Sequence, residues 1–208
     1  MDARIKSGIL ISINELLIMP RRSINFAQGS YYHVYNRGNN YQTIFFEREN
    51  YLHFLKLVRR YLIANNILVL AYCLMPNHYH FLVQCNGGNL SESMQLLSLA
   101  YTKGINKRFN RVGSLFQGRF QAILVNYDDY LVHLVRYIHL NPVKADLVKI
   151  ASEWEFSSFS EYAGVRNGSL PTMELILAMI SSEDAYHSFL TDHTISAMPQ
   201  IRTLMLDE

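Results

Sequence analysis

Two histidines, His78 and His80, are two positions apart in the run 75–83, which has β-strand character. Side chains alternate between the two faces of a strand, so both imidazoles are expected to leave the same face. Neutral imidazole binds divalent metal ions well, and this pair would supply half of a metal site. The alternative is that both are polar residues on the wet face of an antiparallel sheet. A third ligand from another segment would favour the metal site.

A tyrosine and an asparagine, Tyr137 and Asn141, are four positions apart in a segment with helical periodicity, so their side chains should share one helix face. The amide oxygen of Asn141 could complete the metal shell. A phenol is a weak nucleophile at neutral pH, but a divalent metal on a phosphodiester stabilises the charge that grows at phosphorus. Attack by Tyr137 would give a phosphotyrosine that keeps the bond energy, so the strand can be rejoined without a nucleotide cofactor.

Tyr130 lies seven positions before Tyr137 and shares its helix face, so helical geometry alone does not choose between them. Their neighbours do, because the residue four positions after Tyr130 is Leu134, which cannot bind a metal. The alternative role for Tyr137 is to fill space at the edge of the core, as tyrosine commonly does in an amphipathic helix.

The chain has 208 residues, half of them hydrophobic, and a formal net charge of +2 at pH 7. This composition predicts one globular domain with an appendage and argues against extended disorder. The net charge is too small to indicate nucleic-acid binding by itself. However, the stretch 93–127 has no acidic residue and contains the basic residues Lys103, Lys107, Arg108, Arg111 and Arg119. This cluster predicts a phosphate-binding surface or, alternatively, an ordinary solvated one.

The cysteines and the N-terminal segment bear on cellular setting. Cys73 and Cys85 lack the spacing of a CxxC motif, which fits a protein of the reduced cytoplasm. The apolar run 8–13 is too short to span a membrane, so we expect no membrane association. The foldable pattern begins near Gly29, and we interpret residues 1–19 as an N-terminal extension, with the hypothesis that Met19 marks the natural start.

The elements that must position these side chains follow from composition and periodicity. We expect strands at 31–36, 67–74, 78–84 and 119–126, and helices at 49–64, at 91–109 and from Asp128 to a stop enforced by Pro142. The order predicts an α+β fold in which helices pack on an antiparallel sheet. Further helical segments are expected at 172–180 and 182–191.

Four sequence blocks in order carry a family resemblance. They are Tyr32-His33-Val34 with Asn36-Arg37-Gly38-Asn39, then the blocks 71–80, 113–120 and 137–145. Together they resemble the single-tyrosine HUH transposases (transposase IS200-like), and are most similar to the branch associated with repetitive extragenic palindromes (REP). The resemblance covers roughly residues 20–160. It divides the chain into the extension 1–19, an HUH transposase-like catalytic domain at 20–150 and a C-terminal extension at 151–208.

The resemblance implies a ferredoxin-like antiparallel sheet with helices packed on one face, plus a C-terminal helical extension. It implies Tyr137 as the nucleophile and His78, His80 and Asn141 as ligands of Mg²⁺ or Mn²⁺. The implied activity is single-stranded DNA cleavage and strand transfer, that is, DNA transposition, through a 5′-phosphotyrosine beside a hairpin.

The resemblance also implies a DNA-contacting set. Its members are Arg37, Lys103, Lys107, Arg108, Arg111, Gln117 and Arg119. The remaining histidines that we weighed, His33, His53, His133 and His139, are interpreted as structural by default, with a position near the site as the alternative for His139.

Two alternative functions remain open. The first is a non-catalytic hairpin DNA-binding protein derived from such a transposase. The second is a metal-dependent hydrolase that uses water and forms no covalent adduct. We expect a monomer that binds single-stranded or hairpin DNA, with a dimer as the alternative.

Overall fold

The computed structural model of the chain describes residues 26–126, 128–180 and 186. Within these residues four strands form one sheet: β1 (Tyr31–Arg37), β2 (Ile67–Met75), β3 (His78–Cys85) and β4 (Gln121–Val125). The α-helices are α1 (Arg48–Tyr61), α2 (Leu90–Arg108), α3 (Asp128–Lys144), α4 (Phe159–Tyr162) and α5 (Glu174–Ile180). Short 3₁₀ segments lie at Asn39–Tyr41, Ile63–Asn65 and Ala151–Glu153. None of the helices described is long and apolar enough to cross a membrane.

The sheet has the strand order β2-β3-β1-β4, and every neighbouring pair is antiparallel. Together with the chain order β1-α1-β2-β3-α2-β4, this is the ferredoxin-like topology. The predicted fold class is therefore confirmed. The predicted strand 119–126 is shorter than expected, because pairing with β1 covers only Gln121–Val125.

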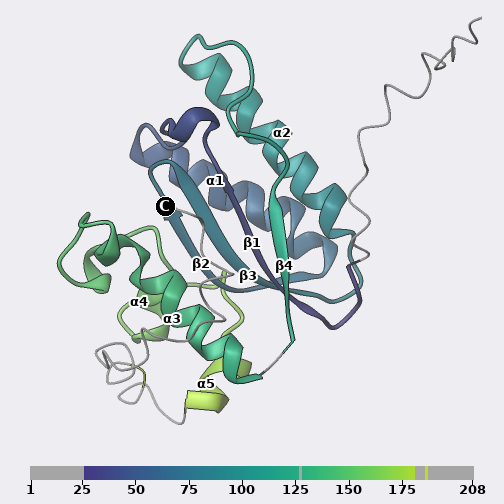
Figure 1. Cartoon of the computed structure of the whole chain (residues 1–208), viewed down its shortest axis with the longest axis vertical. Helices are drawn as coiled ribbons and strands as arrows, with labels where there is room; N and C mark the ends of the chain where they lie inside the picture. Colours follow the sequence, from purple (N-terminus) through teal and green to yellow (C-terminus); the bar gives the residue numbers. More distant parts are fainter. Residues whose placement is uncertain (1–25, 127, 181–185, 187–208) are drawn as a thin grey trace, which may run out of the picture.

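Helices cover both faces of the sheet (Figure 1). On one face, α1 and α2 pack through Phe54 and Leu97 in the same core as Val34 of β1. On the other face, α3 packs through Leu134 in a second core with Leu82 of β3. The expectation of helices on one face therefore holds for α1 and α2 and is corrected for α3. The physical reason is that β2 is apolar at nearly every position and must be covered on both faces.

Helix α3 does not end at Pro142, as we predicted, but continues to Lys144. A proline inside a helix costs one backbone hydrogen bond, because it has no N–H. Here the helix ends only two residues later, where Ala145 N–H donates to the Asn141 carbonyl at 3.0 Å and Leu147 N–H donates to the Pro142 carbonyl at 3.0 Å. The missing N–H of Pro142 therefore affects only the last turn of α3.

The described residues after 150 lie along the edge of β2. Three backbone hydrogen bonds join them to this strand: Leu74 N–H to the Phe156 carbonyl, Ser158 N–H to the Tyr72 carbonyl, and Thr172 N–H to the Val69 carbonyl, at 2.8–2.9 Å. The predicted helix 172–180 is confirmed as α5. The predicted helix 182–191 and the extension 1–19 lie outside the described residues. The division at residue 150 remains a proposal.

Candidate active site

Strand β3 and helix α3 bring the four predicted site residues together. His78 and His80 both point to the α3 side of the sheet, while Tyr79 between them belongs to the core on the α1 and α2 side. The ring centroids of His78 and His80 are 5.0 Å apart, and that of Tyr137 on α3 is 5.5 Å from that of His80. Asn141 follows Tyr137 by one helical turn and lies close enough to His78 to affect the pKa of its imidazole. The predicted face assignments for both elements therefore converge on one site.

Hydrogen bonding determines which ring nitrogen of His78 carries the proton. Its Nδ1 lies 2.7 Å from Oδ1 of Asn77, in the turn between β2 and β3. An amide oxygen only accepts, so the proton lies on Nδ1 and Nε2 keeps its lone pair. The Nε2 atom is buried and has no hydrogen-bond partner of normal geometry in the described part of the chain.

His80 is held by another histidine, His33 on β1. The Nε2 atom of His33 lies 3.0 Å from Nδ1 of His80, with the ring planes 15° apart. Both imidazoles are fully buried. The two nitrogens share one proton, and when it lies on His80 Nδ1, the Nε2 lone pair of His80 is free. That Nε2 is also buried without a hydrogen-bond partner among the residues described.

Burial keeps both candidate ligands neutral. It lowers the pKa of His78 to about 4, with a smaller opposing effect from the nearby Asn141 side chain and a further lowering by the positive charge of Arg37. The pKa of His80 is lowered well below its usual value by burial first, and then by His78 and His33. Neutral imidazole is the form that binds metals, so no proton has to be displaced from either ring at neutral pH.

The side chain of Asn141 is oriented by its own helix. Its Nδ2 donates to the Tyr137 carbonyl at 3.0 Å, and the side chain is 2% exposed. The amide nitrogen is therefore committed, which leaves the amide oxygen as the atom available to a cation.

A divalent metal fits these residues. Among the described residues, the buried Nε2 atoms of His78 and His80 have no hydrogen-bond partner, and each Nδ1 contacts a neighbouring group, which is how metal-bound histidines are usually oriented. No group of three or more His, Cys, Asp or Glu side chains in the described residues could hold a metal ion. The candidate site therefore depends on the Asn141 oxygen or on groups from a substrate.

Tyr137 is nearly buried, with 5% of its surface exposed. Its ring stands almost perpendicular to the rings of His80 and His33, at 80° and 86°. The Lys144 ammonium lies 4.8 Å from its ring centroid, a cation–π distance. The Tyr137 ring thus lies between the imidazoles of His33 and His80 and the ammonium group of Lys144.

The predicted DNA-contacting residues separate into groups. Arg37 lies close enough to His78 to lower the pKa of its imidazole, and its Nε donates to Oε1 of Gln117 at 2.5 Å. Arg108 is paired with Glu47 at 3.0 Å.

The remaining basic residues of the set lie on or after α2. Arg111 donates to Gln42 at 2.9 Å, while Lys103 and Lys107 are exposed on α2, and Arg119 is exposed just before β4. DNA contact by these residues stays a prediction.

The family model "Transposase IS200 like" matches residues 27–141, more than half of the chain. The chain belongs to the IS200-like transposase family. The matched segment contains both histidines and Tyr137, and its last residue is Asn141. The resemblance seen in the sequence is thereby confirmed.

Two known proteins are similar to this family member. A Haemophilus influenzae protein described as a REP-associated tyrosine transposase is 32% identical over an alignment of 100 residues, and the alignment covers 43% of this chain and 57% of the relative. The chain thus matches little more than half the length of that relative. The solved structure of a REP-associated tyrosine transposase bound to a REP hairpin covers 74% of this chain and 97% of its own, with a TM-score of 0.58 and 20% identity. This second likeness shows a shared fold.

Sequence reasoning missed His33. We had interpreted it as structural, whereas its Nε2 contacts Nδ1 of a candidate metal ligand. A signal was present in the Tyr32-His33-Val34 block of the family, and strand alternation puts His33 on the same face as Tyr35. Only the pairing of β1 with β3 reveals that this is the face of His80.

Proposed function

We propose that the protein cleaves single-stranded DNA and transfers the cleaved strand through a covalent bond to Tyr137. The observation that carries the proposal is the convergence at one buried place of Tyr137, Asn141 and two neutral histidines whose Nε2 atoms have no hydrogen-bond partner in the described part of the chain. Membership of the transposase family supports it. The proposal includes hairpin DNA as the partner, because a protein of the same fold is bound to a REP hairpin.

In this proposal His78, His80 and Asn141 hold Mg²⁺ or Mn²⁺. The bound ion would orient the scissile phosphodiester and stabilise its developing charge. Manganese accepts imidazole ligands more readily than magnesium does, so we expect stronger activity with Mn²⁺ in vitro.

Tyr137 would attack the phosphorus of the scissile diester. The bond between its phenolic oxygen and phosphorus forms while the bond from phosphorus to the 3′ oxygen breaks, which leaves a free 3′-hydroxyl and a 5′-phosphotyrosine. A second 3′-hydroxyl can then displace the tyrosine and rejoin the strand. Packing of the ring against His80, with centroids 5.5 Å apart, would hold the nucleophile in place.

A denaturing gel tests the proposal directly. Full-length protein is incubated with Mn²⁺ and labelled single-stranded DNA from the flanks of its own gene. We expect a covalent protein–DNA adduct for wild type and none for Tyr137→Phe, because phenylalanine has no nucleophilic oxygen. Tyr130→Phe is the matched control, since it removes a phenol one heptad earlier on the same helix.

An adduct that persists in Tyr137→Phe, or cleavage without any adduct, would contradict the tyrosine mechanism. The latter result would favour a hydrolase that uses water. Hairpin binding without cleavage across several DNAs would instead favour the non-catalytic DNA-binding protein.

A further inference from the structure

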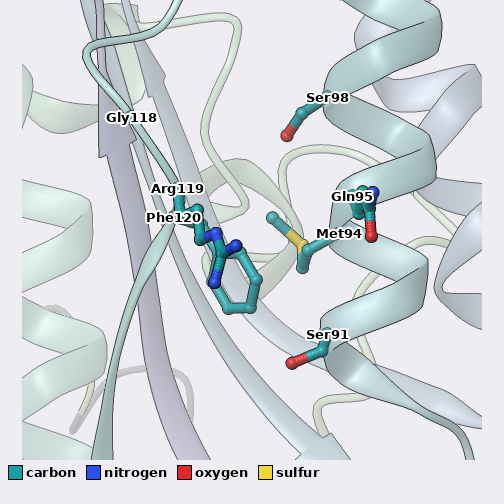
Figure 2. A pocket seen from close by; sticks show the side chains of 7 residues that line it. All are labelled: Ser91, Met94, Gln95, Ser98, Gly118, Arg119 and Phe120. Carbon is teal, nitrogen blue, oxygen red and sulfur yellow. The ribbon is translucent and has the colours of Figure 1, made fainter. Parts of the chain in front are cut away.

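A pocket of about 470 Å³ lies between α2 and the residues that lead into β4, on the sheet face opposite the candidate active site. Figure 2 shows Ser91, Met94 and Ser98 pointing from α2 toward Phe120 and Arg119 across the gap. Its volume is within the range of pockets that hold one small ligand or one nucleotide.

The pocket lining combines three kinds of chemistry. Met94 and Phe120 are buried and give it an apolar, partly aromatic floor. Ser91 and Ser98 are two helical turns apart on α2 and place hydroxyl groups along one wall, with the Gln95 amide between them. This mixture of an aromatic ring and hydrogen-bonding groups suits the flat face and polar edge of a nucleobase.

Arg119 supplies a positive charge at the rim. It differs from the other arginines of the predicted DNA-contacting set, because Arg37, Arg108 and Arg111 each bond to another side chain. Within the described residues, the Arg119 guanidinium has no hydrogen bond or ion pair and is exposed. It is therefore available to a phosphate.

The pocket is connected to the candidate active site by a short stretch of chain. Arg37 lies beside His78, and its side chain bonds to Gln117 at 2.5 Å. Two residues after Gln117 comes Arg119 at the pocket, and the Gly118 carbonyl between them accepts a hydrogen bond from Asn36 at 3.1 Å. A DNA strand that leaves the active site past Arg37 can follow these residues around the sheet edge to the pocket.

We propose that this pocket binds one unpaired nucleotide of the DNA strand on which the active site acts. The base would lie against Phe120 and Met94, and Arg119 would contact its phosphate. This inference rests on the proposed function and adds a site that holds one base directly. Such a site would make affinity depend on a single unpaired position of the DNA.

Gly118 allows the pocket to be filled without backbone strain. A Cβ at this position meets no atom within 4 Å, and its φ is outside the left-handed region. Gly118→Leu should therefore occupy the pocket while the fold stays intact. Val112→Leu is the matched control, because Val112 lies in the same connecting segment but is 95% exposed. Both are made in full-length Tyr137→Phe, so that the DNA is bound and not cleaved.

Binding is measured by fluorescence anisotropy in EDTA, with single-stranded DNA from the flanks of the gene and one abasic site moved along it. We expect one position at which the abasic site weakens binding by about 5- to 150-fold, the usual value of one stacked base. In Gly118→Leu this position-specific loss should disappear, and in Val112→Leu it should remain.

Arg119→Gln gives a second, independent readout. It should weaken binding at every abasic position alike and reduce the slope of log affinity against log salt by about 0.7, the value for one phosphate contact on a single strand. Arg60→Gln, an exposed arginine on α1, should leave the slope unchanged. Thermal melts of each variant report whether the fold is retained.

A position-specific loss that survives in Gly118→Leu, or no such position at all, overturns the pocket assignment. The adduct assay separates this result from a failure of the proposed function. If wild type forms the Tyr137-dependent adduct while the abasic scan is flat, the enzyme proposal stands and the pocket proposal fails.

Discussion

At the scale of single residues, the chemistry of the site depends on hydrogen bonds to the far nitrogen of each histidine. Asn77 fixes the proton of His78, and His33 shares one proton with His80. When that proton lies on His80 Nδ1, both Nε2 atoms keep a lone pair, in a place where burial also disfavours the charged imidazolium. Both imidazoles are therefore neutral, which is the charge state that a metal requires.

The role of His33 can be measured without catalysis. We expect His33→Leu to weaken Mn²⁺ binding by about 10- to 100-fold, as for other groups that orient a metal-bound histidine. His33→Gln should restore much of the affinity, because its side-chain oxygen can accept from His80 Nδ1. Isothermal titration calorimetry with Mn²⁺ provides the values. Equal affinities for His33→Leu and wild type would show that His33 only fills space.

At the scale of elements, α3 is tied to the sheet by a buried polar network. His139 on α3 contacts Oγ of Ser158 through Nε2 at 2.7 Å, and Tyr186 OH through Nδ1. The Ser158 hydroxyl in turn accepts from Tyr72 N–H of β2 at 2.9 Å. His139 faces away from the candidate site and fixes the helix that carries Tyr137. These contacts with Ser158 and Tyr186 agree with the interpretation of His139 as a structural residue.

This network predicts a dependence of stability on pH. Burial lowers the pKa of His139 to about 3, so the unfolded chain takes up a proton below about pH 6.5 while the folded chain does not. Stability from this group is therefore fully present above pH 6.5 and is lost as the pH falls toward 3. The expected loss for His139 alone between pH 7 and pH 5 is about 2 kcal/mol. The shifts of His78 and His80 act in the same direction.

Urea unfolding at pH 7 and pH 5 measures this effect. The midpoint should fall at the lower pH, with an unchanged m-value. A midpoint that is constant or rises on acidification would mean that His139 is not held neutral in the folded protein.

At the scale of the whole molecule, the segment after residue 150 covers the outer strand β2. β2 is an edge strand by its order in the sheet, yet its free backbone groups bond to residues 156–172. Ser157 also forms an isolated bridge with Cys73. The segment after residue 150 thus closes an edge that would otherwise invite pairing with another chain. It also contributes Phe159 and Tyr162 to the core beneath α3.

We therefore predict that a chain ending at residue 150 is strongly destabilised. Removing Phe159 and Tyr162 alone should cost several kcal/mol, since each large aromatic residue buried in a core is worth about 3–5 kcal/mol. Circular dichroism melts and size-exclusion chromatography compare the full-length chain with the chain that ends at residue 150. If the shorter chain melted at the wild-type temperature as a single species, residues after 150 would be an independent appendage.

The sequence by itself determined the local geometry of this site. Strand alternation placed His78 and His80 on one face, and helical spacing placed Tyr137 and Asn141 on another, because these periods are properties of the backbone. Only the tertiary structure decided which faces meet. The contact between His33 and His80 joins residues 47 positions apart and depends on β1 lying beside β3. The position of α3 on the second face of the sheet depends on burying β2 from both sides, a requirement of packing that no local period encodes.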